Sequence, residues 1–394
     1  MLNRKTVKIL LAAAAILVLC LSLVGCMRGS RPLGWSSAAI DGDIIYIATT
    51  QGKLVALDNT SQSIKFAVDI RDGSSSGGSC TNAQASVSVY GTPVIADGKV
   101  FIASYTGEIF AFNAENGASV WKKGDSQNKT YGKFVSGFVT YQDNIIIADD
   151  NGVVYAFSQD KGDLVWSYQA KGAVWATPTL FEDKIYLGDY NNNYYCLNAS
   201  NGAEIWKHTE DSGKGAYYSQ ATVITTGDGQ NLVIVGNFDR SMHAFNAQTG
   251  AVVWHQTEIS KSWFWAAPVF KDNKIYAASL DGSIYILNPI DGSTIKSLAM
   301  GKDKKDGLVS SPVVVGDVVV AITQKGYLYS IDDNDNLKAL QTDAVAATVH
   351  APLATNGSQV IIHTVTDEKV IVIDPVSGNN IWSKDMANIN KNES

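Results

Sequence analysis

The sequence predicts an all-β protein, an eight-bladed β-propeller of four-stranded antiparallel blades. A segment made of an alternating strand, a tight turn ending in Gly and a closing Trp recurs along the chain. The copies are spaced about 40 to 55 residues apart, the length of a propeller blade with four short strands. Apolar and polar residues alternate within the copies with the period of strands rather than of helices. Together, the recurring segment, its spacing and its period predict blades arranged around an axis.

The first residues predict export and lipidation. Basic residues precede an apolar run from Ile9 to Val24, and Leu23-Val24-Gly25-Cys26 closes the run. This order is typical of a lipoprotein signal peptide. We expect cleavage before Cys26 and lipid attachment to this cysteine, so that lipids and not a spanning helix anchor the mature chain. The alternative is an uncleaved anchor, but the run is short for a membrane span of about 20 residues.

We therefore expect a signal peptide over residues 1–25, a lipidated tether over 26–34, the propeller over 35–386 and a polar tail over 387–394. The mature protein is then an extracytoplasmic, membrane-anchored lipoprotein. In a host with two membranes it would lie on the periplasmic leaflet of the outer membrane, because Met27 stands where inner-membrane lipoproteins of enterobacteria have Asp. In a host with one membrane it would lie on the outer face of the cytoplasmic membrane.

The charge of the chain excludes one class of partner. The formal net charge is −7, and removal of the signal peptide with its three basic residues brings it to −10. A strongly acidic surface argues against binding to nucleic acid.

The repeats also predict which residues hold the blades together. The clearest copies end at Trp121, Trp166, Trp206, Trp254 and Trp382, each four residues after a glycine, and degenerate copies lie near Gly52, Gly282 and Gly326. The glycine is expected at a positive φ, where the chain reverses. A large flat side chain repeated on an outer strand is expected to pack between adjacent blades. We predict a blade-docking role for these five tryptophans.

The best-formed copy resembles a known repeat. Residues 244–254, Ala-Phe-Asn-Ala-Gln-Thr-Gly-Ala-Val-Val-Trp, are similar to the repeat of the pyrroloquinoline-quinone (PQQ) propellers, and the resemblance extends from about Trp35 to Met386. It implies the quinoprotein-type propeller fold. One branch of that family, the quinoprotein dehydrogenases, binds PQQ and Ca²⁺ on the propeller axis. This chain has no pair of adjacent cysteines and lacks the long insertions of those enzymes, so we expect neither PQQ nor Ca²⁺.

The other branch comprises lipid-anchored, non-catalytic propellers similar to BamB of the outer-membrane β-barrel assembly machinery. The length, the lipobox and the repeats fit this branch. The resemblance implies a protein-interaction scaffold or adaptor in the cell envelope, with an envelope protein as partner. One departure is expected: an inner strand already begins at Trp35 and the chain ends on an outer strand at Ile381 to Lys384, so that the ring closes without strand exchange.

No catalytic or metal-binding constellation stands out along the sequence. The histidines lie in or beside different strands, and no pair has the spacing of metal ligands. Residues 332–336, Asp-Asp-Asn-Asp-Asn, resemble the opening of a calcium loop, but Leu337 replaces its glycine and no Glu stands at its twelfth position. We predict no catalytic residues and no metal site.

Alignment of the blades at the start of the innermost strand predicts a binding face. The aligned positions are Trp35, Tyr90, Val135, Trp175, Tyr218, Trp265, Val309 and Val349, and four places earlier stand Arg31, Lys171, Lys214, Lys261 and Lys305. Because all outer-to-inner connections emerge on one face, we expect an aromatic and basic ring there. Asp149, Asp189, Asp239 and Asp281 on neighbouring loops would dilute its positive field.

We interpret this ring as the face that grips an extended or acidic segment of an envelope protein, with Trp35, Tyr90, Trp175, Tyr218, Trp265, Lys171, Lys214, Lys261 and Lys305 as its candidate residues. Two alternatives remain. The aromatic side chains could seal the tapering core while the lysines are merely solvated, or a quinone or small ligand could lie over the axis. Acidic and amide side chains that converge beneath the ring to hold a metal would favour the ligand.

Overall fold

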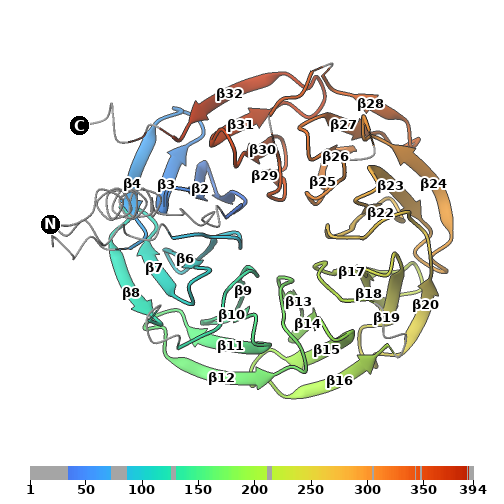
Figure 1. The fold of residues 1–394 in the computed structure, drawn as a ribbon, viewed down its shortest axis with the longest axis horizontal. Coiled ribbons are helices and arrows are strands. Elements are labelled where there is room, and N and C mark those ends of the chain that lie inside the picture. The colour runs from blue at the N-terminus through green and yellow to red at the C-terminus, as the bar shows by residue number, and fades with distance from the viewer. Residues whose placement is uncertain are drawn as a thin grey trace, which may run out of the picture. The chain divides into compact units, whose positions relative to one another are not determined.

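Each blade is an antiparallel sheet of four strands that follow one another in the chain. The computed structural model describes residues 34–71, 87–125, 130–210, 215–303, 306–341, 343–346, 348–387 and 389. Within these residues eight such sheets stand in a ring, as Figure 1 shows. The predicted fold class is confirmed. The predicted signal peptide and Cys26 lie outside the described residues.

The strands fall into four concentric sets. The innermost strands are β1 (Ala39–Asp41), β5 (Val94–Ala96), β9 (Val139–Tyr141), β13 (Thr179–Phe181), β17 (Thr222–Thr225), β21 (Val269–Lys271), β25 (Val313–Val315) and β29 (Ala354–Thr355). The second strands are β2 (Ile44–Ala48), β6 (Lys99–Ala103), β10 (Asn144–Ala148), β14 (Lys184–Gly188), β18 (Asn231–Gly236), β22 (Lys274–Ala278), β26 (Val318–Ile322) and β30 (Val360–His363).

The third strands are β3 (Lys53–Asp58), β7 (Ile109–Asn113), β11 (Val153–Ser158), β15 (Asn193–Asn198), β19 (Met242–Asn246), β23 (Ser283–Leu287), β27 (Leu328–Ile331) and β31 (Lys369–Ile373). The outermost are β4 (Ile64–Asp69), β8 (Ser119–Lys123), β12 (Leu164–Gln169), β16 (Glu204–Thr209), β20 (Val252–Gln256), β24 (Thr294–Ala299), β28 (Leu337–Ala339) and β32 (Asn380–Asp385). In the part of the chain that is described, no helix is long and apolar enough to span a membrane.

The hydrophobic core lies between the blades. A cluster of buried apolar side chains fills each interface between neighbouring sheets. The second and third strands are covered on both faces, and their sequences are therefore nearly continuous apolar runs, such as Ile145-Ile146-Ile147. In the outermost strands, more buried and exposed side chains alternate, because only one face of each strand meets a neighbouring blade.

The five repeat tryptophans reach from one blade to the next. Their indole N–H groups donate hydrogen bonds across the interface, from Trp121 to Gln159 O (3.0 Å), Trp166 to Ala199 O (3.1 Å), Trp206 to Ala247 O (3.1 Å), Trp254 to Pro289 O (2.9 Å) and Trp382 to Asn59 Oδ1 (3.0 Å). Each acceptor lies in the turn between the third and the outermost strand of the neighbouring blade.

Two physical reasons require a glycine at the end of that turn. Gly250 has a φ of 71°, in the left-handed region that disfavours a side chain. It also lies under the ring of Trp206, and an added Cβ would come within 2.6 Å of Trp206 Cδ2. The Gly of one blade and the Trp of the preceding blade therefore form a single packing unit.

The ring closes without strand exchange, as the sequence predicts. The first sheet contains β1 to β4 and the last contains β29 to β32. Side chains join them: Ser37 Oγ donates to Pro352 O (2.7 Å), and the Glu368 carboxylate accepts from Thr50 N and from Gln51 Nε2 (3.2 Å to Gln51). Buried apolar residues of β2, β3, β30 and β31 form the core of this interface.

The innermost strands begin later than predicted. The sequence suggests a strand from Trp175, but β13 starts at Thr179, and β1 starts at Ala39 and not at Trp35. The ladder to β14 pairs only Thr179, Leu180 and Phe181. Trp175 and Trp35, which precede the two strands, line the pocket on the axis instead of joining the ladders.

Candidate functional site

Two sets of loops meet on one face of the propeller. These are the connections from an outermost strand to the next innermost strand and the loops between the second and third strands. A buried polar residue begins the latter loop in every blade, namely Thr49, Ser104, Asp149, Asp189, Asn237, Ser279, Thr323 and Thr364. This position lets the two sets of loops bond to each other.

Asp189 shows how the loops are held. Its Oδ2 accepts from the main-chain N–H of Gly172 (2.9 Å) and from Tyr195 OH (2.8 Å), and its Oδ1 accepts from the N–H groups of Asn191 and Asn193 (both 2.9 Å). Asp149 binds the preceding connection in the same way, through Gly132 N (2.8 Å). The two carboxylates lie on this face, but they are fully buried acceptors and do not face a partner.

The predicted aromatic ring surrounds a pocket on the axis. Trp35, Tyr90, Trp175, Tyr218 and Trp265 all line this axial pocket, together with Val135 and Val309. One member of the ring was predicted wrongly. Val349 is buried in the core between the last two blades, and His350 lines the pocket in its place.

The error at Val349 has a local cause. The eighth blade's connection is offset by one residue, which exchanges the inward and outward side chains. Burial lowers the pKa of His350, so its ring is uncharged at neutral pH. His350 also lies beside Trp35, with ring centroids 5.7 Å apart.

The axial pocket does not fit the cofactor of the quinoprotein dehydrogenases. Ca²⁺ takes six to eight oxygen ligands from carboxylates, carbonyls and waters. Among the described residues that line the pocket, none carries a carboxylate and Gln220 is the only amide. The pocket measures about 110 Å³, below the roughly 300–1,000 Å³ of sites that bind small molecules.

The acidic turn at residues 332–336 is engaged by lysines of the preceding blade. Lys274 Nζ donates hydrogen bonds to both carboxylate oxygens of Asp335, at 2.8 Å each. Lys271 Nζ forms an ion pair with Asp333 Oδ1 at 2.5 Å. These side chains hold the sixth blade to the seventh.

A wider hollow lies off the axis, over the fourth, fifth and sixth blades. We call it the aromatic groove. Its rings are Trp175, Tyr190, Tyr218, Phe238, Trp263 and Trp265, and its volume is about 840 Å³. The rings touch in a continuous series, with centroids 5.0 Å apart for Trp175 and Tyr218, 4.3 Å for Tyr218 and Phe238, and 4.7 Å for the stacked Phe238 and Trp263.

Much of the aromatic groove is open to solvent. Trp175, Tyr190 and Trp263 are 38%, 55% and 48% exposed, whereas Tyr218 beneath them is buried. Burial raises the pKa of the Tyr218 phenol, which therefore stays protonated at neutral pH. Sequence alignment missed Tyr190, Phe238 and Trp263, since they lie on loops outside the aligned strand start.

Two of the four predicted lysines are described. Lys171 and Lys261 are exposed and stand on the connections that lead into the groove. The main chain at Lys171 is fixed, because its carbonyl accepts from Asn191 Nδ2 (2.8 Å), and Lys261 N donates to Asp281 Oδ2 (2.9 Å). Lys214 and Lys305 lie outside the described residues, as does Arg31.

The fold and this face define an eight-bladed propeller of PQQ-like repeats that presents an aromatic surface on one side. The chain belongs to the family described as outer membrane protein assembly factor BamB, whose model matches residues 23–134, 107–261 and 150–384.

Curated relatives carry the same description. The chain is 24% identical to BamB of Shewanella oneidensis over 160 residues, which cover 36% of this chain and 40% of that protein. It is 23% identical to BamB of Moranella endobia over 328 residues, 71% of this chain and 84% of that protein. The match to the Shewanella protein thus spans less than half of that relative's length.

Solved structures share the fold at low identity. BamB from Moraxella catarrhalis superposes with a TM-score of 0.67 at 14% identity, covering 83% of this chain and 93% of that one. A europium-containing methanol dehydrogenase superposes with a TM-score of 0.69 at 12% identity, covering 87% of this chain and 82% of that one. At such identities the likeness concerns the fold alone.

Proposed function

We propose that this chain is a lipid-anchored, non-catalytic adaptor of the cell envelope and that its aromatic groove binds an extended segment of an envelope protein. The groove carries the proposal. Contiguous exposed aromatic surface is uncommon on monomeric proteins and marks binding sites. Trp and Tyr are also the residues that most often dominate the binding energy of protein interfaces.

The shape of the groove favours a chain segment as the occupant. Its rings form a contiguous patch in which Tyr218 and Phe238 each contact several neighbouring rings. Such a patch suits an extended segment whose apolar side chains stack on the rings. Lys171 and Lys261 do not line the groove, but they are exposed on the connections that lead to it and favour a segment that carries acidic residues.

Membership of the BamB family supports an envelope setting. The relatives are described as outer membrane protein assembly factors, and we propose the same setting here, with anchoring through Cys26. A quinone or small ligand over the axis is the alternative. The residues of the axial pocket argue against it, because they offer no carboxylate to hold a metal.

Site-directed photocrosslinking in intact cells tests this proposal. A photoreactive amino acid at Tyr190 would lie in the groove, and one at Ile290, which is 67% exposed in a turn on the opposite face, serves as the control. We expect a discrete crosslink to an envelope protein from Tyr190 and none to that protein from Ile290. Equal crosslinks from both positions, or none from Tyr190, would contradict the proposal.

A further inference from the structure

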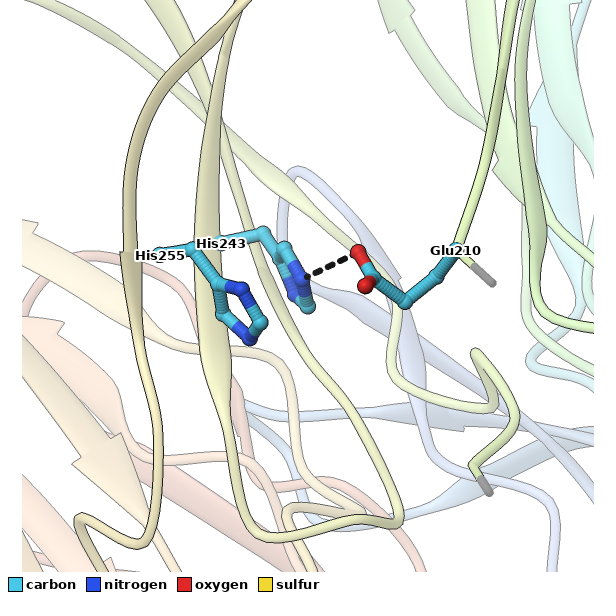
Figure 2. Close-up of side chains that lie close together, drawn as sticks. All are labelled: Glu210, His243 and His255. Atoms are coloured by element: carbon cyan, nitrogen blue, oxygen red, sulfur yellow. Dashed lines mark ion pairs between the residues drawn. The ribbon is translucent and has the colours of Figure 1, made fainter. Parts of the chain in front are cut away.

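Three ionisable side chains meet between the fourth and fifth blades. His243 lies on β19, His255 lies on β20, and Glu210 follows β16 of the preceding blade. Figure 2 shows the two imidazole rings side by side with the Glu210 carboxylate directed towards His243. One ligand atom from each residue lies within 4.8 Å of the other two.

The sheet register brings the two histidines together. His243 is paired directly with His255 across the β19–β20 ladder, and directly opposed residues on neighbouring strands point to the same side. Their rings are stacked, with centroids 3.9 Å apart and planes 18° apart. Glu210 enters from the adjoining blade, and its Oε2 lies 3.5 Å from His243 Nε2.

The protein itself does not satisfy the buried nitrogen atoms of this cluster. His243 is fully buried, and neither of its ring nitrogens has a hydrogen-bond partner among the described residues. The same is true of His255 Nε2. Buried polar atoms in folded proteins nearly always have a partner in the protein or an ordered water, so three such ring nitrogens in one place leave room for a water or an ion.

The donor set and the distance from His243 to Glu210 suit a metal ion. One of the two stacked imidazoles has to rotate about its Cβ–Cγ bond for both to bind the ion, because a metal lies in the plane of each imidazole that ligates it. The 3.5 Å between His243 Nε2 and Glu210 Oε2 is long for a hydrogen bond. It is close to the roughly 3.4 Å that separates two ligand atoms on a tetrahedral ion with bonds of about 2.1 Å. Imidazole nitrogen with one carboxylate is a set that Zn²⁺ and neighbouring first-row ions bind.

We propose that Glu210, His243 and His255 form a binding site for one divalent first-row transition-metal ion, with Zn²⁺ as the ion of best fit. His208 is a positioning residue, because its Nε2 lies 3.4 Å from Glu210 Oε2 and holds this carboxylate in place.

The position of the site gives it a structural consequence. Glu210 also lines the aromatic groove, and it belongs to the connection from the fourth blade to the fifth. A metal held by Glu210 and two residues of the fifth blade would join the two blades beneath the groove. The site thus shares Glu210 with the lining of the groove, but it uses none of the groove's aromatic side chains and does not require a partner.

Metal binding by the full chain tests the proposal. The protein, purified without a histidine tag and stripped with a chelator, is dialysed against Zn²⁺ and its metal content measured. We expect one ion per chain in the wild type. The variants Glu210→Gln and His255→Gln should bind at least about 10-fold more weakly, as losses around metal sites commonly do. Glu258→Gln, the same change at an exposed carboxylate of the same blade, should bind like the wild type.

A second measurement does not depend on the variants folding. Co²⁺ added to the stripped wild-type chain should give the visible absorption of a tetrahedral site, and Zn²⁺ should abolish it. Circular dichroism checks that each variant retains its strands. A wild type that binds no stoichiometric Zn²⁺ and gives no such Co²⁺ spectrum would overturn the proposal. So would folded Glu210→Gln and His255→Gln proteins that bind Zn²⁺ as tightly as Glu258→Gln.

Discussion

Trp382 of the last blade donates its indole N–H to Asn59 Oδ1 of the first blade, at 3.0 Å. This is the same contact that each other repeat tryptophan makes with the next blade, except that a side-chain oxygen replaces the main-chain carbonyl. The ring is therefore closed by the interface that repeats around it and not by a shared sheet.

Truncation of Trp382 should destabilise the protein severely. The ring is buried, and Trp382→Ala should lower the free energy of unfolding by about 3–5 kcal/mol through the cavity it leaves. Trp254→Ala should cost a similar amount, because Trp254 makes the equivalent contact. Lys171→Ala, on an exposed loop, should change it by less than about 0.5 kcal/mol. Denaturant unfolding measures all three, and equal losses would contradict the assigned blade interface.

Acid should weaken the interface between the last blade and the first. His363 is buried, with Nδ1 2.7 Å from Ser36 O and with no hydrogen-bond partner for Nε2 among the described residues. Burial lowers the pKa of His363 below the ordinary 6.5, against the opposing effects of the Ser36 hydrogen bond and of Glu368. As the pH falls below about 6.5, His363 of the unfolded chain takes up a proton before His363 of the folded chain does. The free energy of unfolding is therefore greatest above about pH 6.5 and declines below it.

The variant His363→Asn isolates this effect. Asn keeps a donor for Ser36 O but cannot titrate. The free energy of unfolding of the wild type should fall between about pH 7 and pH 5, by at most about 1.4 kcal/mol per pH unit for one group. The variant should lose less over the same range. An equal loss in both proteins would show that His363 is not responsible.

The lipid anchor is tested by metabolic labelling. The wild type should incorporate labelled palmitate, and Cys26→Ala should not, because the modified thiol is gone. Cys20→Ala, a cysteine inside the predicted signal peptide, is the control and should label normally. Unchanged labelling of Cys26→Ala would refute lipidation at this residue.

Charge reversal tests whether the lysines contribute to partner binding. Changing Lys171, Lys214 and Lys261 to Glu should slow association with an acidic partner, and binding of the wild type should weaken as salt rises. Reversal of Asp97, Asp183 and Asp272, which lie in turns on the opposite face, to Lys should leave the association rate nearly unchanged. Surface plasmon resonance at two salt concentrations makes the comparison. Identical rates for the lysine variant and the wild type at both salt concentrations would remove the electrostatic part of the proposal.

The sequence predicts the fold well because each blade is encoded locally. The Gly of the turn and the Trp four residues later form the interface with neighbouring blades, and both recur at fixed positions. The aromatic positions that precede the innermost strands follow from the same register, and five of them line the axial pocket. Two expectations fail: the innermost strands begin later than predicted, and His350 replaces Val349 where an offset of one residue changes which side chain faces the axis.

The rest of the site depends on contacts that local patterns do not encode. Tyr190, Phe238 and Trp263 lie on loops whose course is set by buried acceptors such as Asp189, and no repeat position marks them. The cluster of Glu210, His243 and His255 joins two blades, and its histidines are twelve residues apart in sequence but opposite each other in the ladder. Strand register, and not sequence spacing, is the signal that reveals them.

The affinity of the crosslinked partner for groove variants tests the central claim most directly. Isothermal titration should show that Trp175→Ala and Trp263→Ala each lose about 2 kcal/mol or more of binding free energy, as expected for aromatic anchors. Val376→Ala, which removes an apolar side chain that is 69% exposed in a turn on the opposite face, should bind as the wild type does. Folded Trp175→Ala and Trp263→Ala proteins that bind the partner with wild-type affinity would contradict the assignment of the aromatic groove as the binding surface.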